Sequence, residues 1–221
     1  NVHQDKENNF NSKFHRRLAY DEILANLLVL SQVRKRIKKF KKIKKKFNNH
    51  LSNKLIRNFN FELTKNQISV IKEINNDLQS EYKMFRLLQG DVGSGKTIVS
   101  LIAAANVIKS NWQVALMAPT EILAKQHYNL ACKIFKSTNI NIKFLSGNSD
   151  SKQKKLIQEN LINEKINFLI GTHALFQKNI QFKNLGLVII DEQHKFGVRQ
   201  RIELSKKGGK NCDILLMSAT P

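Results

Sequence analysis

Residues 85–97 read FRLLQGDVGSGKT, a short apolar run followed by a glycine-rich loop and the first residues of a helical stretch. The three glycines, Gly90, Gly93 and Gly95, let the backbone bend so that successive N–H groups face one anion. The helix that begins after the loop adds the partial positive charge of its N-terminus at the same point. A chance match of this kind is expected in about one chain in a hundred or fewer. The stretch therefore predicts a phosphate-binding loop.

The end of this loop carries the two side chains with the most specific chemistry. Lys96 can reach the β- and γ-phosphates of a nucleotide, and the Thr97 hydroxyl is placed to ligate Mg²⁺. ATP and Mg²⁺ are therefore the predicted cofactors. The residues predicted to bind the nucleotide along the loop are Gly90, Asp91, Val92, Gly93, Ser94, Gly95, Lys96 and Thr97.

Short apolar runs alternate with amphipathic helical stretches from residue 84 onward. Strands with continuous apolar runs are buried on both faces, which predicts an α/β fold with a parallel sheet covered by helices on both faces. Ligands of such sheets bind beyond the carboxyl ends of the strands. The expected strands are 85–89, 113–118, 142–145, 168–170, 187–191 and 214–217.

A carboxylate pair ends the fifth of these runs, where LVII is followed by DEQH at 191–194. Asp191 would hold Mg²⁺ through water, and Glu192 would orient or deprotonate the attacking water. An Asp at a helix N-cap followed by Glu would look the same. The phosphate loop about 100 residues upstream favours the metal interpretation.

The first 58 residues contain no Gly or Pro and differ from the rest of the chain. Apolar residues between Leu24 and Phe47 recur at three- and four-residue spacing, which indicates an amphipathic helix or a helix pair. From Arg34 to Lys46, ten of thirteen residues are basic. This run either lies along a phosphate backbone or forms a solvated lysine face over an apolar stripe.

Composition limits the classes of partner. The formal net charge of +21 over 221 residues favours an anionic partner such as nucleic acid or an anionic membrane surface. The longest apolar runs are too short to cross a bilayer, and no signal peptide is visible, so a cytoplasmic protein is expected. Cys132 and Cys212 lack the spacing of a redox pair or zinc site and are interpreted as reduced core residues.

Five longer stretches of sequence contain the phosphate loop, the DEQH residues and other short motifs. DEQH after an apolar strand, a GKT loop and a downstream SAT resemble a superfamily 2 helicase, and the longer stretches closely resemble those of the bacterial RecG helicases. They are RLLQGDVGSGKT at 86–97, ALMAPTEILAKQH at 115–127, GTHALFQ at 171–177, VIIDEQHKFGVRQR at 188–201 and LLMSATP at 215–221. RRLAYDEILANLL at 16–28 is similar to the helix that leads into the motor of that family. The resemblance covers nearly the whole chain.

The resemblance implies a RecA-like P-loop NTPase domain at 59–221, preceded by a basic helical extension at 1–58. Gln67, in FELTKNQ, would bind the adenine base, although it could simply start a helix. Thr120 and Thr172 would contact DNA phosphates, with ordinary helix capping as the alternative. The catalytic residues would be Lys96, Asp191, Glu192 and His194, and the residues coupling hydrolysis to DNA would be Ser218, Ala219 and Thr220.

The sequence has further histidines near these motifs and departs from the family pattern at two positions. His194 could bridge the γ-phosphate side to the SAT motif, whereas His127 and His173 are given only a structural role. Lys195 stands where the family usually has Arg, and Lys83 where Pro is common.

The implied function is that of the first motor domain of a monomeric, ATP-dependent DNA helicase acting on forks and junctions. The second motor domain, which supplies an arginine to the γ-phosphate, and the wedge domain are expected outside this sequence, so the chain alone should hydrolyse ATP very slowly. A translocase of the Mfd type would carry Phe in place of Ser94 and a DEEQ box. A nucleic-acid-binding module with non-catalytic ATP is the other alternative, and Lys96, Asp191 and Glu192 argue against it.

Overall fold

The structure is a computed structural model. It describes residues 40–48, 50–57, 62–177, 179–191 and 209–219, together with ten positions between 17 and 32. Glu192, His194, Lys195 and Thr220 lie outside these residues, so the structure does not place them.

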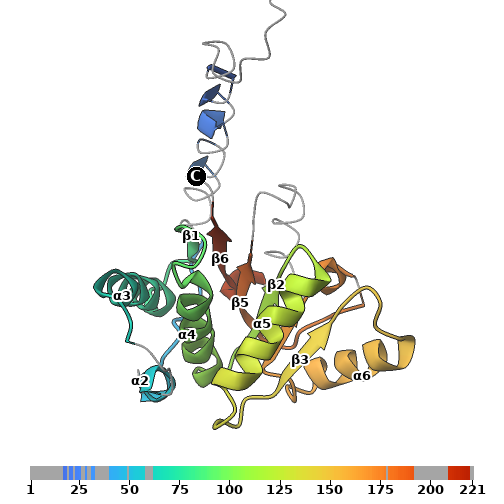
Figure 1. Cartoon of the computed structure of the whole chain (residues 1–221). Coiled ribbons are helices and arrows are strands. Elements are labelled where there is room, and N and C mark those ends of the chain that lie inside the picture. The colour runs from blue at the N-terminus through green and yellow to red at the C-terminus, as the bar shows by residue number, and fades with distance from the viewer. Residues whose placement is uncertain are drawn as a thin grey trace, which may run out of the picture.

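Six parallel strands form one sheet in the order β1-β6-β5-β2-β4-β3 (Figure 1). Each predicted apolar run coincides with a strand to within two residues at either end. The predicted parallel sheet is therefore confirmed. The strands are β1 (Phe85–Gln89), β2 (Gln113–Met117), β3 (Ile142–Leu145), β4 (Phe168–Gly171), β5 (Leu185–Ile190) and β6 (Asp213–Ser218).

Helices cover both faces of this sheet. Side chains alternate along each strand, so Val114 and Leu116 of β2 pack in one apolar layer while Ala115 and Met117 pack in the other. The first layer includes residues of α2 to α5, and the second includes residues of α6 and of the 3₁₀ turn His173–Phe176. The helices are α2 (His50–Arg57), α3 (Lys65–Gln79), α4 (Lys96–Lys109), α5 (Glu121–Ile134) and α6 (Ser151–Ile162).

The N-terminal segment departs from the helix expected between Leu24 and Phe47. The described positions between 17 and 32 are helical, but 40–48 is extended and pairs with the chain before β1 through an antiparallel bridge between Lys41 and Tyr82. Phe40 is 54% exposed and Ile43 is 60% exposed, whereas Lys42 and Lys45 are buried. The helix prediction was wrong for this stretch, and burial is the opposite of that expected for these four residues, although Lys41, Lys44 and Lys46 are exposed as lysines usually are.

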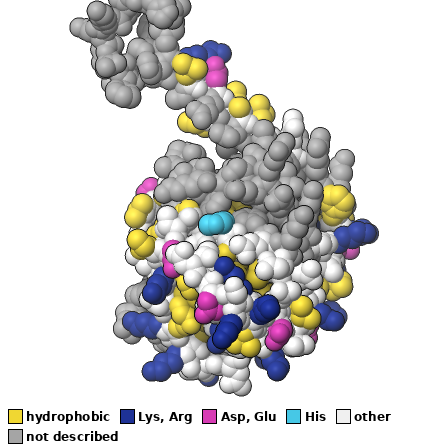
Figure 2. Space-filling model, turned by 90° about the vertical axis from the view of Figure 1, so that its right-hand side faces the viewer, with side chains coloured by type: hydrophobic (Ala, Val, Ile, Leu, Met, Phe, Trp, Pro, Cys, Tyr) yellow, Lys and Arg dark blue, Asp and Glu magenta, His cyan; other side chains and the backbone are white. Residues whose placement is uncertain are grey.

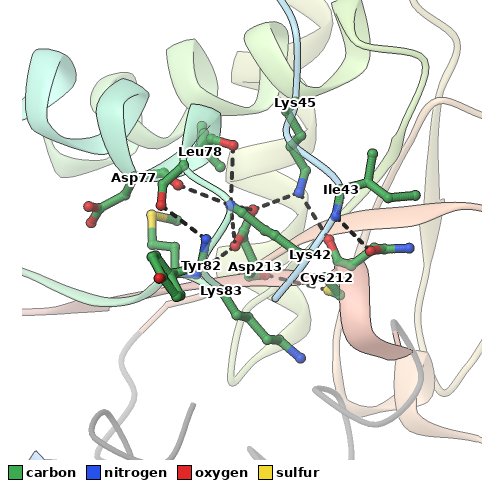
Figure 3. A network of polar contacts seen from close by, with 12 residues as sticks. Lys42, Ile43, Lys45, Asp77, Leu78, Tyr82, Lys83, Cys212 and Asp213 are labelled. Carbon is green, nitrogen blue, oxygen red and sulfur yellow. Dashed lines mark hydrogen bonds and ion pairs between the residues drawn. The ribbon is translucent and has the colours of Figure 1, made fainter. Parts of the chain in front are cut away.

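The two buried lysines share one carboxylate at the start of β6 (Figure 3). The Nζ atoms of Lys42 and Lys45 lie 2.7 Å and 2.6 Å from Oδ2 of Asp213. Lys42 also donates to the carbonyl oxygens of Asp77 and Leu78, and the other Asp213 oxygen accepts the backbone N–H of Met84. These two lysines therefore form neither the solvated face nor the phosphate track that the sequence suggested.

Burial shifts the proton affinity of groups around this cluster. Burial lowers the pKa of Lys42, against the opposing attraction of Asp213, and it also lowers the pKa of Lys83, whose ammonium donates to the Gly209 carbonyl at 3.0 Å. Burial raises the pKa of the Cys212 thiol to about 12, so this thiol stays protonated at neutral pH.

Two further predictions concern cysteines and membranes. Both cysteines are free thiols, Cys212 buried and Cys132 only partly so. Within the part of the chain that the structure describes, no helix has the length and apolar character needed to span a bilayer.

Replacement of Asp213 by Asn tests the energetic role of the lysine cluster. Loss of the carboxylate leaves two buried ammonium groups without a counter-charge, and breaking a buried ion pair in this way costs about 3–5 kcal/mol. The free energy of unfolding in urea should fall by that amount. Glu73→Gln, which alters the more exposed ion pair with Arg86, should cost less than about 1 kcal/mol. Equal losses in the two variants would contradict a special role for Asp213.

Candidate functional site

The strand order brings the predicted nucleotide-binding residues to one edge of the sheet. β6 lies between β1, which leads into the phosphate loop, and β5, which leads into Asp191. Neighbouring strands are about 4.8 Å apart, so the ends of β1 and β5 are separated by about 10 Å. That distance suits a triphosphate with its magnesium ion between the loop and the acid.

The phosphate loop has the backbone geometry that its glycines were expected to provide. Gly93 and Gly95 both have φ of 83°, a region that residues with a Cβ rarely adopt. Gly95 is the N-cap of α4 and gives it no side-chain capping hydrogen bond. In most helices a capping side chain accepts hydrogen bonds from the first backbone N–H groups. Because α4 has no such cap, its first N–H groups are suited to binding an anion.

The Lys96 ammonium folds back onto its own loop. Its Nζ donates to the carbonyl oxygens of Gly90 at 2.5 Å and Asp91 at 2.7 Å. These neutral acceptors hold the lysine beside the loop. Phosphate oxygens form stronger, charge-assisted hydrogen bonds with ammonium groups and could replace them.

Gln67 joins the start of α3 to the phosphate loop. Its Oε1 accepts the Thr64 backbone N–H at 2.9 Å, while the Thr64 hydroxyl accepts the Gln67 N–H, so the helix-start alternative is confirmed as a capping box. Its Nε2 also donates to the Ser94 carbonyl at 2.9 Å. A Cβ built on Gly95 would lie 2.3 Å from that nitrogen. The contact with the loop was not foreseen, and the adenine contact stays a prediction.

Asp191 lies at the end of β5 and is paired with a histidine. His127 of α5 places Nε2 2.6 Å from Oδ2 of Asp191, with side chains 9% and 12% exposed. The Asp191 backbone N–H donates to the Met117 carbonyl at 2.8 Å, which fixes the residue to the end of β2. His127 was assigned a structural role only, and the stretch EILAKQH gave no sign of a partner so far along the chain.

The first residue of the SAT motif contacts the phosphate loop through the backbone. Ser218 ends β6, is buried, and its carbonyl accepts the N–H of Gly90 at 3.3 Å. Ala219 follows it in a bend. The role of Ser218 and Ala219 in coupling stays a prediction, as do the roles of the residues outside the described part of the chain.

The two threonines predicted to contact nucleic acid follow β2 and β4 at the same edge. The Thr120 hydroxyl accepts the Leu123 N–H at 3.3 Å, so the capping alternative holds for it. Thr172 makes no such cap, and its hydroxyl has no hydrogen-bond partner among the described residues. Because Thr172 is only 4% exposed, contact with a phosphate would require its surroundings to open.

The described surface does not gather its positive charge in one place on the side that Figure 2 shows. Lys and Arg side chains are spread there among Asp and Glu. The excess charge of the sequence therefore does not by itself mark a binding surface on this side.

A family model and individual relatives both match this chain to helicases. The sequence model of the DEAD/DEAH box helicase family matches residues 64–221. ATP-dependent DNA helicase RecG of Aquifex aeolicus is 46% identical over 215 residues, covering 97% of this chain and 27% of the relative. RecG of Bacillus subtilis is 44% identical, covering 93% of this chain and 30% of the relative.

Solved structures agree with these relatives. A structure of RecG bound to a three-way DNA junction matches with a TM-score of 0.78 and 44% identity, covering 93% of this chain and 27% of that one. The UvsW helicase of bacteriophage T4 matches with a TM-score of 0.58 and 14% identity, covering 80% of this chain and 62% of that one, which supports the fold alone. This chain spans less than a third of the length of the RecG proteins. Since the family match covers well over half of its residues, the chain belongs to the DEAD/DEAH box helicase family.

Proposed function

We propose that the chain is the ATP-binding first motor domain of a RecG-type DNA helicase that acts on branched DNA. The observation that carries this is the meeting of the phosphate loop, Ser218 and Asp191 at the ends of three adjacent strands. In the complete protein, ATP hydrolysis would drive translocation on duplex DNA, reversing forks and migrating junctions in recombination and repair. A cytoplasmic location and a monomeric state are part of the proposal.

The residues at this edge fit an ATP–magnesium complex. The loop amides and Lys96 would bind the phosphates, and Gln67 would reach the adenine base. Thr97 and Asp191 would hold Mg²⁺, which neutralises charge on the phosphates when bound. Glu192 would orient the attacking water.

Nucleic acid would bind along the same edge of the sheet. Thr120, at the start of α5, and Thr172, at the end of β4, would contact phosphates of DNA. Ser218, Ala219 and Thr220 would couple this contact to hydrolysis, with His194 bridging to them. The hydrogen bond from Gly90 to Ser218 supports the coupling role because it joins the phosphate loop to the SAT strand directly.

The sequences of the phosphate loop and of the DEQH motif at 191–194 distinguish this proposal from a close alternative. An Mfd-type translocase would carry Phe in place of Ser94 and a DEEQ box, whereas this chain has GSGKT and DEQH. A module with non-catalytic ATP would not require both Lys96 and Asp191 at the same edge.

Lys96→Ala tests the nucleotide site. The side chain hydrogen-bonds to two loop carbonyls that are exposed or only partly buried, so its loss should leave the Tm of the nucleotide-free protein nearly unchanged. Hydrogen bonds to charged groups contribute about 1.5–3 kcal/mol, so affinity for ATP should fall at least about tenfold by calorimetry. Lys109→Ala, at the far end of α4, should change neither quantity. A large drop in Tm for Lys96→Ala would instead assign this lysine a structural role.

Glu192→Gln tests the assignment of the water-activating residue. In the complete protein the variant should bind ATP with unchanged affinity, because the amide preserves size, and should lose nearly all hydrolysis because it cannot accept a proton. Steady-state ATPase assays and calorimetry measure the two effects. Glu164→Gln, in an exposed turn after α6, serves as the control. Normal turnover by Glu192→Gln would remove Glu192 from the catalytic residues.

The nature of the nucleic acid is tested by ATPase stimulation of the complete protein. Forked DNA should stimulate most, linear duplex DNA less, and RNA least, because the proposed activity requires a DNA branch. Equal stimulation by RNA and forked DNA would exclude the RecG assignment and keep the motor. Absence of any stimulation would favour the module with non-catalytic ATP.

A further inference from the structure

We infer that His127 is a positioning residue that sets the Asp191 carboxylate for magnesium. The inference rests on the proposed function, in which Asp191 helps to hold Mg²⁺. His127 then has a role in the nucleotide site, beyond the purely structural role expected from its sequence context.

The contact has the properties of a firm hydrogen bond. Nε2 of His127 and Oδ2 of Asp191 are 2.6 Å apart, and both side chains are largely buried. Hydrogen bonds to a carboxylate that are shielded from water are shorter and stronger than those between neutral groups. A bond to one carboxylate oxygen also limits rotation of the whole group, so it determines where the second oxygen points.

Backbone contacts near the pair hold His127 and Asp191 in place relative to the sheet. Met117, the last residue of β2, accepts the backbone N–H of Asp191. The same strand end leads, after Ala118 and Pro119, into the Thr120 cap of α5, which carries His127. The chain therefore closes a ring from β2 through α5 and the side-chain pair back to β2. These contacts limit how far His127 and Asp191 can move relative to each other.

Supporting hydrogen bonds of this kind affect metal sites measurably. Replacing a residue that holds a metal-binding side chain in place typically lowers metal affinity or activity by a factor of about 10–100. A histidine that merely filled the core would influence folding stability and leave the response to magnesium unchanged. The two roles are therefore separable by experiment.

The test compares His127→Leu with His127→Gln in the complete protein. Affinity for a slowly hydrolysed ATP analogue is measured by calorimetry with magnesium and again in EDTA, and the Tm of the nucleotide-free protein is measured alongside. In the Leu variant the gain in affinity due to magnesium should shrink about tenfold or more, while affinity in EDTA stays close to that of the wild type. The Gln variant keeps an N–H donor and should retain most of the gain.

His50→Gln, in α2 and remote from His127 in the sequence, is the matched control and should behave as the wild type. If the Leu variant does not fold, His127→Asn takes its place, because its shorter amide should not reach Asp191.

Three results would overturn the inference. An unchanged magnesium gain in the Leu or Asn variant, with or without a lower Tm, would leave His127 a structural residue. Equal loss in the Gln and Leu variants would show that the hydrogen bond is not the cause. A wild-type protein that binds no nucleotide would overturn the proposed function itself, and this inference with it.

Discussion

The position of β6 between β1 and β5 is the constraint on which the candidate site depends. Because all three strands are parallel, the loop after β1, Ser218 at the end of β6 and Asp191 after β5 reach the same edge. The pairing of Gln89 with Ser218 and of Ile190 with Leu216 sets how far each strand extends. A slip of one residue would turn every side chain of β6 to the other face of the sheet.

The opposite end of β6 is fixed by the charge cluster around Asp213. That residue begins the strand and binds Lys42 and Lys45, so the extended segment 40–48 is attached to the strand that ends at Ser218. Burial of three charged groups has a large desolvation cost, so the cluster is better understood as a specific connection than as a large source of stability.

The parts of the fold predicted from sequence are those that depend on local pattern. Continuous apolar runs identified the six strands, and the glycine spacing predicted the tight turn before α4. The lysine cluster could not be predicted in this way, because periodicity places lysines on the surface and the partner carboxylate is 171 residues beyond Lys42. The pairing of His127 with Asp191 spans 64 residues and was missed for the same reason. Contacts that depend on tertiary packing leave no periodic signal.

Lys96 and Asp191 differ in whether their present hydrogen bonds would have to break when a nucleotide binds. Lys96 already has two hydrogen bonds to loop carbonyls, so a phosphate would replace existing partners, and only the difference between the two sets of bonds would add to affinity. Asp191, by contrast, is held by an imidazole and by the end of β2, neither of which a nucleotide would need to displace. The lysine side is therefore able to exchange partners while the acid stays in place. Under the proposed function, release of the product would leave the Asp191 carboxylate where it is.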